Sequence, residues 1–151
     1  MDEQKIFDSR LTQVRQAMRE QGLQTLLVHD AGRHNFLRMN YVAYLTDFIS
    51  VGPDTMLVIP LDDAPVLYLA PVWDIPRAQE ESQIGDVRPF KEFHARLAKT
   101  AGKVGLIGRE AMHVGLHDAI VKTLGQAPVN AKDIIETMAR CKGPFELERM
   151  R

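Results

Sequence analysis

Residues 55–70 read TMLVIPLDDAPVLYLA, and this stretch decides the class of fold that we expect. Two apolar runs, 55–59 and 66–70, enclose a polar turn that carries Asp62 and Asp63 between two prolines. Short apolar runs on either side of such a turn are typical of a β-hairpin. Because the strands of a hairpin are antiparallel, the sheet that contains them cannot be purely parallel.

Strands and helices alternate on both sides of this hairpin. Further strands are predicted at the short apolar runs 25–29, 87–90, 103–107 and around Val129. Helices are predicted from a cap at Asp8 or Ser9 to Gly22, at 74–83, at 92–101, at 112–124 before Gly125, and from Asn130 through Met138. Residues 31–48 fit neither the period of a helix nor that of a strand. The alternation predicts one α/β domain built on a mixed β-sheet.

Composition restricts the kind of protein that this is. The chain has 151 residues, 45% hydrophobic and 26% charged, which is typical of one folded domain. A net charge of −1 gives no electrostatic footprint for nucleic acid or for an anionic membrane. The single Cys141 excludes an internal disulfide and fits a reducing compartment, so we expect a cytoplasmic protein. The polar start lacks a secretory signal, and no apolar run is long enough to span a membrane.

Residue patterns that could carry chemistry each have a simpler structural explanation. His113 and His117 have the spacing of a zinc pair on a helix, but no third ligand follows. The polar stretch 30–35 follows a predicted strand, where ligands bind in open α/β sheets, although turn residues alone explain it. Cys141 lacks an evident base. For Trp73 we expect a place in the core, with a partner contact as the alternative.

The last residues begin another helix. Gly143 can act as its N-cap, Pro144 suits the first helical position, and Glu146 lies near the positive end of the helix dipole. Only about eight residues follow the cap, fewer than the ~12 that an isolated helix needs. This pattern indicates a helix that continues beyond Arg151, with a frayed tail as the alternative.

Several motifs resemble those of creatinase- and prolidase-type proteins. Tyr44-Leu45-Thr46-Asp47-Phe48 is similar to their Tyr-Leu-Thr-Gly-Phe motif, with Asp47 in place of the glycine. The other matching positions are Phe7, Arg10-Leu11, Met18, Gly22-Leu23 and 26–28 at the start, Arg77-Ala78 after the hairpin, and Arg140, Lys142 and Glu146 at the end. The last group resembles the linker into the catalytic domain, with Gly143 in place of the usual Ser or Thr.

The resemblance implies a fold and a domain organisation. It implies that residues 1–142 form a creatinase/prolidase-type N-terminal domain, in which a mixed β-sheet with a ribonuclease H-like motif is flanked by helices on both faces. Residues 143–151 would then start a linker helix into a catalytic domain that this chain lacks.

The resemblance also implies a function, that of the non-catalytic domain of an M24-type, pita-bread metallohydrolase. Its catalytic domain would hold two divalent metal ions (Mn, Co or Zn) and act on a small peptide or amide, so that this chain has no catalytic or metal-binding residue of its own. An Xaa-Pro dipeptidase or an aminopeptidase P-like enzyme is favoured over a creatinase, because the segment 49–54 lacks the arginine of creatinases.

Such domains form homodimers and lend residues to the partner's active site. By this resemblance Tyr44, Asp47, Phe48 and Asp54 are the residues expected near the substrate. The alternative is a protein-binding module from a relative that has lost catalysis.

Overall fold

A computed structural model describes residues 3–32 and 38–151 of the chain. Its strands form one sheet in the order β4-β3-β2-β1-β5-β6. The described strands are β1 Thr25–Asp30, β2 Thr55–Pro60, β3 Val66–Leu69, β4 Asp86–Pro89, β5 Val104–Ile107 and β6 Val129–Asn130. β2 pairs antiparallel with both β1 and β3, whereas β1–β5, β3–β4 and β5–β6 are parallel. The predicted hairpin and the mixed sheet are both confirmed.

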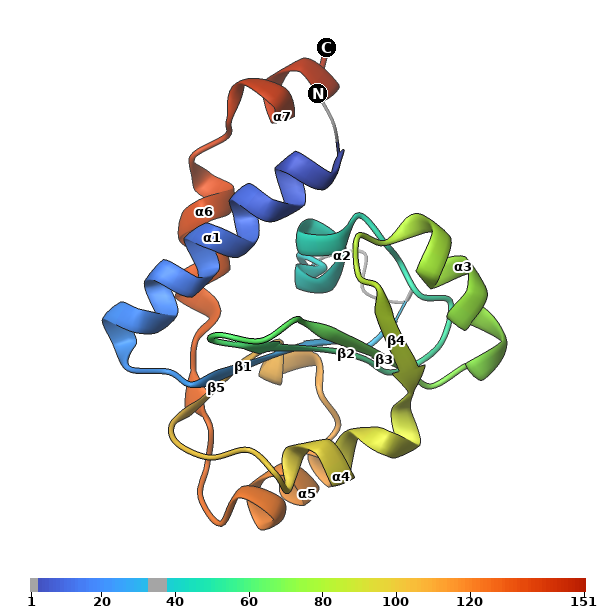
Figure 1. The fold of residues 1–151 in the computed structure, drawn as a ribbon, viewed down its shortest axis with the longest axis vertical. Helices are drawn as coiled ribbons and strands as arrows, with labels where there is room; N and C mark the ends of the chain where they lie inside the picture. The colour runs from blue at the N-terminus through green and yellow to red at the C-terminus, as the bar shows by residue number, and fades with distance from the viewer. Residues whose placement is uncertain (1–2, 33–37) are drawn as a thin grey trace.

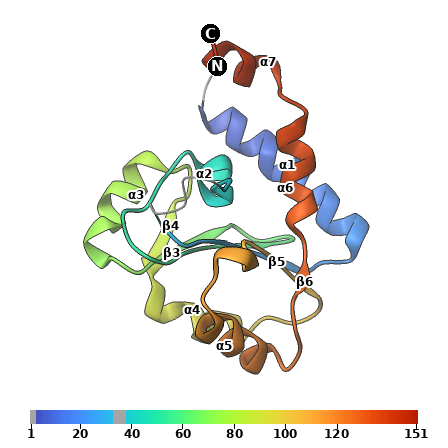
Figure 2. The same cartoon turned by 180° about the vertical axis from the view of Figure 1, so that it is seen from behind.

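Helices cover both faces of this sheet. The described helices are α1 Glu3–Gln21, α2 Tyr41–Thr46, α3 Ile75–Glu81, α4 Phe93–Leu97, α5 Val114–Leu124, α6 Lys132–Arg140 and α7 Pro144–Arg149. Figures 1 and 2 show α1, α2, α3 and α6 on one side of the sheet and α4 and α5 on the other. The α/β fold with helices on both faces is thereby confirmed.

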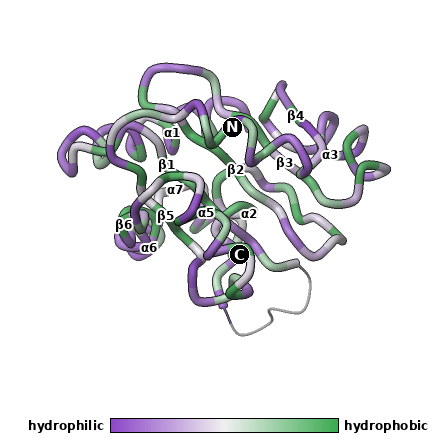
Figure 3. The backbone as a smooth tube through the Cα atoms, turned by 90° about the horizontal axis from the view of Figure 1, so that it is seen from below, coloured by the Kyte–Doolittle hydropathy of each residue, from purple (hydrophilic) through white to green (hydrophobic). Residues whose placement is uncertain are grey.

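Alternate strand residues supply two separate cores. Leu26 and Val28 of β1 pack in the cluster that contains α1 and α2, whereas Leu27 packs in the cluster that contains α4 and α5. This follows from the period of two along a strand, which sends successive side chains to opposite faces. The helices therefore need only one apolar face each, and Figure 3 colours them in alternating hydrophilic and hydrophobic segments.

The two largest differences between predicted and observed helix boundaries lie in α1 and α4. Helix α1 begins at Glu3 rather than after Asp8 or Ser9, because Ile6 and Phe7 are buried and extend its apolar face by a turn. Helix α4 ends at Leu97, and a short 3₁₀ turn, Phe90–Glu92, precedes it.

Helix ends marked by glycine lie where they were predicted. Gly22 and Gly125 have φ values of 68° and 74° after α1 and α5. Helix α7 starts as expected, since the Gly143 N–H donates to Glu146 Oε2 at 2.9 Å and Pro144 is its first residue. The assignment of 143–151 as a linker remains a prediction. In the part of the chain that the structure describes, no helix is long and apolar enough to cross a bilayer.

Leu27 provides a test of the double-sided core, because it is fully buried on the central strand. We expect Leu27→Ala to lower the free energy of unfolding by about 3 kcal/mol, since it leaves a cavity that its neighbours cannot fill. Urea unfolding followed by circular dichroism measures this loss. Val114→Ala is the control, because Val114 is 74% exposed and should change stability by less than about 0.5 kcal/mol. Equal losses in the two variants would contradict the assignment of Leu27 to the core.

Candidate functional site

The candidate loop is the segment 44–54, which joins the end of α2 to the start of β2. Asn40 is the N-cap of α2, and its side chain accepts a hydrogen bond from the Ala43 N–H at 2.8 Å. Asp47 is the C-cap of α2 and has a left-handed backbone with φ of 57°. Asp47 stands where the related motif has glycine, and the left-handed backbone at this position explains both residues. Aspartate is one of the few residues other than glycine that adopts this conformation readily.

The two aromatic residues of the candidate loop act as its anchors. Phe48 is only 1% exposed, and the guanidinium of Arg77 lies 4.5 Å from the centre of its ring. Tyr44 is partly buried, with the guanidinium of Arg10 4.3 Å from its ring. Phe48 therefore holds the loop from beneath and does not present its ring to solvent.

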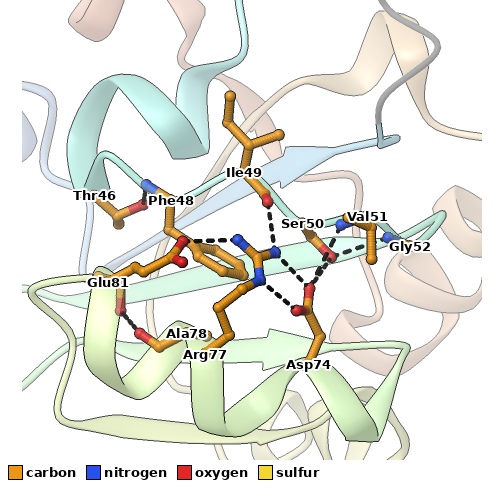
Figure 4. A network of polar contacts seen from close by, with 11 residues as sticks. Thr46, Phe48, Ile49, Ser50, Val51, Gly52, Asp74, Arg77, Ala78 and Glu81 are labelled. Atoms are coloured by element: carbon orange, nitrogen blue, oxygen red, sulfur yellow. Dashed lines mark hydrogen bonds and ion pairs between the residues drawn. The ribbon is translucent and has the colours of Figure 1, made fainter.

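Arg77 and Asp74 fasten the middle of the candidate loop to α3 (Figure 4). Arg77 donates to the Asp74 carboxylate from Nε at 2.7 Å and from Nη2 at 2.9 Å. Its Nη2 also donates to the Ile49 carbonyl at 2.9 Å, and Nη1 donates to Glu81 at 2.7 Å. The side chain of Asp74 is 1% exposed, so its charge is balanced almost entirely by these contacts. Hydrogen bonds from Arg77 hold the pKa of Asp74 below its usual value.

Asp54, at the other end of the candidate loop, lies between two histidines. Its Oδ1 is 2.8 Å from Nε2 of the buried His29, and its Oδ2 is 3.8 Å from Nε2 of His113. The hydrogen bond with His29 holds the pKa of Asp54 below the usual value. The acidic charge that was expected to face a substrate is thus already partnered within the chain, although Asp54 retains 20% exposure.

The stretch after β1 is organised as a turn. Asp30 Oδ2 accepts hydrogen bonds from the Gly32 N–H at 3.1 Å and from Asn40 Nδ2 at 3.0 Å. Burial raises the pKa of Asp30. A Cβ at Gly32 would lie 2.4 Å from the Gly52 carbonyl, so this turn packs directly against the candidate loop. The remainder of the polar stretch, 33–35, lies outside the described residues.

Three exposed apolar side chains lie in the candidate loop and in the turn before α3, and we call Ile49, Val72 and Trp73 together the apolar patch. These side chains are 49%, 56% and 70% exposed. The expectation that Trp73 belongs to the core is wrong, because a 3₁₀ turn at Val72–Asp74 points Asp74 inward and leaves Trp73 outside. The Asp74 and Arg77 contacts bring the backbone of 49–51 next to the turn that carries Val72 and Trp73. Exposed clusters of large apolar side chains mark contact surfaces.

Of the two histidines at the start of α5, His113 has a structural role. His113 is the N-cap of α5, and its Nδ1 accepts a hydrogen bond from the Leu116 N–H at 3.2 Å. Within residues 3–32 and 38–151 no group of three or more His, Cys, Asp or Glu side chains is placed to hold a metal ion.

Sequence patterns alone missed His29, Asp74 and the roles of Arg77 and His113 around the candidate loop. His29 appeared only as part of a strand, yet a histidine within an apolar strand signals that a polar partner must be supplied from elsewhere.

Comparison with known proteins matches residues 10–141 to the family described as the creatinase/prolidase N-terminal domain. The fold is similar to that of a proline dipeptidase from Streptococcus pneumoniae TIGR4, with a TM-score of 0.70 and 18% identity over 87% of this chain and 98% of that one. It is also similar to the creatinase/prolidase N-terminal domain of an X-Pro dipeptidase from Streptococcus pyogenes, with a TM-score of 0.69 and 19% identity over 86% of this chain and 98% of that one.

A longer solved structure shows the same fold in part of its chain. The prolidase from Pyrococcus horikoshii OT3 matches with a TM-score of 0.73 and 19% identity over 93% of this chain. The matched part is only 37% of the prolidase's own length. A search of curated protein sequences finds no match.

Arg77 should be essential for the candidate loop. Arg77→Gln removes the donors that balance the buried Asp74, and we expect it to lower the free energy of unfolding by about 2 kcal/mol. Arg88→Gln is the matched control, because Arg88 makes a similar two-point contact with Asp86 at an exposed position and should leave the urea midpoint unchanged. A loss in the control as large as that in Arg77→Gln would refute the special role of Arg77.

Asp54 should contribute stability that depends on pH. Its folded-state pKa lies below the ordinary 3.8, so the unfolded chain binds the proton more tightly. The stabilisation is present above pH 3.8 and disappears as the pH falls through the lower, folded-state pKa. We expect Asp54→Asn to lose about 1 kcal/mol at pH 5 and progressively less toward pH 2, as measured by urea unfolding. Asp62→Asn changes a carboxylate in the exposed β2–β3 turn, and its difference in stability from the unmodified chain should not change as the pH falls.

Proposed function

Because this chain belongs to the creatinase/prolidase N-terminal domain family, we propose that it is the non-catalytic N-terminal domain of an M24-type metallohydrolase, an Xaa-Pro dipeptidase or aminopeptidase P-like enzyme. The match of residues 10–141 to this family carries the proposal. Coverage supports it, because the chain spans 98% of the S. pyogenes N-terminal domain but only 37% of the P. horikoshii prolidase. The remaining length of such a protein would supply the catalytic domain.

In this proposal the chemistry takes place outside the chain. The catalytic domain that follows α7 would hold two divalent ions, Mn, Co or Zn, and would act on a small peptide or amide in the cytoplasm. The partners of this domain are then its own catalytic domain and a second subunit of a homodimer. The residues described here would bind no catalytic metal and hydrolyse no dipeptide.

The role of this domain would be dimerisation and control of substrate access, through the candidate loop and the apolar patch. Three observations support this role. Trp73 is the kind of large, exposed side chain that dominates protein interfaces. The Arg77 contacts hold the candidate loop rigidly beside it, which lowers the entropy cost of binding. Asp47 lies at the turn of this loop, where its carboxylate would favour a substrate amine over a second carboxylate.

Tyr44, Phe48 and Asp54 would then act in different ways. Tyr44 and Phe48 would position the loop from beneath, as their contacts with Arg10 and Arg77 suggest. Asp54 would position the other end of the loop through its contact with His29, and only the exposed part of its side chain would contact the substrate.

The second candidate function is a protein-binding module derived from an inactive relative. The same apolar patch favours it, because an exposed tryptophan can serve any protein partner. The two functions differ in the whole protein. An Xaa-Pro peptidase hydrolyses Xaa-Pro dipeptides with added Mn, Co or Zn, and a module does not.

Trp73 should be needed for assembly and activity of the whole enzyme. In the protein that carries this domain and its catalytic domain, we expect Trp73→Ser to weaken dimerisation at least about tenfold and to lower kcat/KM on Xaa-Pro dipeptides. Analytical ultracentrifugation and steady-state kinetics measure the two effects.

Val129→Ser is the control, because Val129 is also exposed but lies on β6, at the edge of the sheet opposite β4. Asp47→Asn should lower kcat/KM while leaving the dimer intact. Unchanged assembly and kinetics in both Trp73→Ser and Asp47→Asn would show that this region has only a structural role.

A further inference from the structure

Two residues from opposite ends of the chain form an ion pair beside α1. Arg10 of α1 and Glu146 of α7 are 136 positions apart, yet Arg10 Nη2 lies 3.0 Å from Glu146 Oε1. Their side chains are 11% and 23% exposed, so solvent screens this pair less than it would an ordinary surface ion pair. Both residues belong to motifs that resemble the family, and the structure shows that these motifs meet.

Arg10 also binds the start of the candidate loop. Its Nη1 donates a hydrogen bond to the Tyr44 carbonyl, and its guanidinium lies 4.3 Å from the centre of the Tyr44 ring. One side chain therefore joins α1, the end of α2 and α7. Only a planar guanidinium with several donors can make these contacts together, and a lysine ammonium lacks that geometry.

Glu146 completes the arrangement from the side of α7. While its Oε1 binds Arg10, its Oε2 accepts a hydrogen bond from the Gly143 N–H at 2.9 Å. The same carboxylate thus closes the first turn of α7 and ties that turn to the body of the domain. A glycine cap has no side chain that could accept a hydrogen bond from the first turn of α7, so the Glu146 carboxylate supplies the capping contact here.

Two apolar side chains toward the end of α7 are largely exposed. Leu147 and Met150 are 50% and 69% exposed. A cavity of about 210 Å³ lies between α1, α6 and α7, and Ile6, Met138 and Pro144 are among the residues that line it. Helix α7 has six residues, too few for independent stability. Figures 1 and 2 both show it beyond the end of α6 and away from the sheet.

We propose that Arg10 is a latch that fixes the direction in which α7, and any chain beyond it, leaves the domain, and that couples this direction to the candidate loop. Arg10 is a positioning residue in this scheme. Since its two partners are Glu146 on α7 and the Tyr44 backbone, a displacement of either one alters the support of the other. The latch is a property of this chain alone, so it holds whether or not the proposed enzyme function is correct.

Amide hydrogen exchange of the 151-residue chain tests the latch. We expect Arg10→Gln and Glu146→Gln each to speed exchange at residues 147–149 by about fivefold or more, because α7 loses its charged attachment. Exchange in β1 and β5 should change by less than about twofold in the same samples. Arg10→Lys should restore only part of the protection, since it keeps the charge but not the two-point contact.

Arg15→Gln is the matched control. Arg15 lies on the same helix but donates to the Pro60 carbonyl at 3.3 Å and to the Asp63 carbonyl, away from α7. It should leave exchange in α7 unchanged. Unchanged exchange at 147–149 in Arg10→Gln or in Glu146→Gln, or an equal acceleration in Arg15→Gln, overturns the proposal. If Arg10→Gln does not fold, Glu146→Gln decides alone, because Glu146 lies on the terminal helix α7, outside the two cores of the domain.

Discussion

Complete burial of β1 is the constraint from which the rest of this structure follows. Every residue from Thr25 to Asp30 is buried, and the strand is paired on one edge with β2 and on the other with β5. Because alternate side chains of a strand point to opposite faces, both faces must be covered by apolar elements. The three-layer arrangement of Figure 1, with two separate cores, is the consequence.

The last two residues of β1 carry this constraint to the candidate loop. His29 and Asp30 are polar and buried, so partners must be brought to them. The side chain of Asp54, which precedes β2, is hydrogen-bonded to His29, and that of Asn40, which precedes α2, is hydrogen-bonded to Asp30. Both flanks of the segment between α2 and β2 are thereby tied to the central strand. Gly108 completes this end of the sheet, since a Cβ there would lie 2.2 Å from the His29 carbonyl.

Two arginines then hold the candidate loop by the same means. Arg10 and Arg77 each place a guanidinium over an aromatic ring of the segment, donate to one of its backbone carbonyls and pair with a carboxylate. For Arg10 the carboxylate belongs to α7, and for Arg77 it belongs to the turn that exposes Trp73. The loop, the apolar patch and the departing helix are therefore parts of one polar framework.

The sequence by itself determined most of the local elements but not α2, which lies in the unassigned range 31–48, while the tertiary structure decided how distant residues meet. Apolar runs and turn residues predicted β1, the β2–β3 hairpin, β5 and the starts and ends at Gly22, Gly125 and Gly143, because each depends on neighbours within a few positions. The long start of α1, the exposure of Trp73 and the Asp54–His29, Arg77–Asp74 and Arg10–Glu146 contacts did not follow from any local pattern. Periodicity reports which side chains need burial, but the partner of a buried charge depends on the path of the whole chain, which brings residues 10 and 146 together.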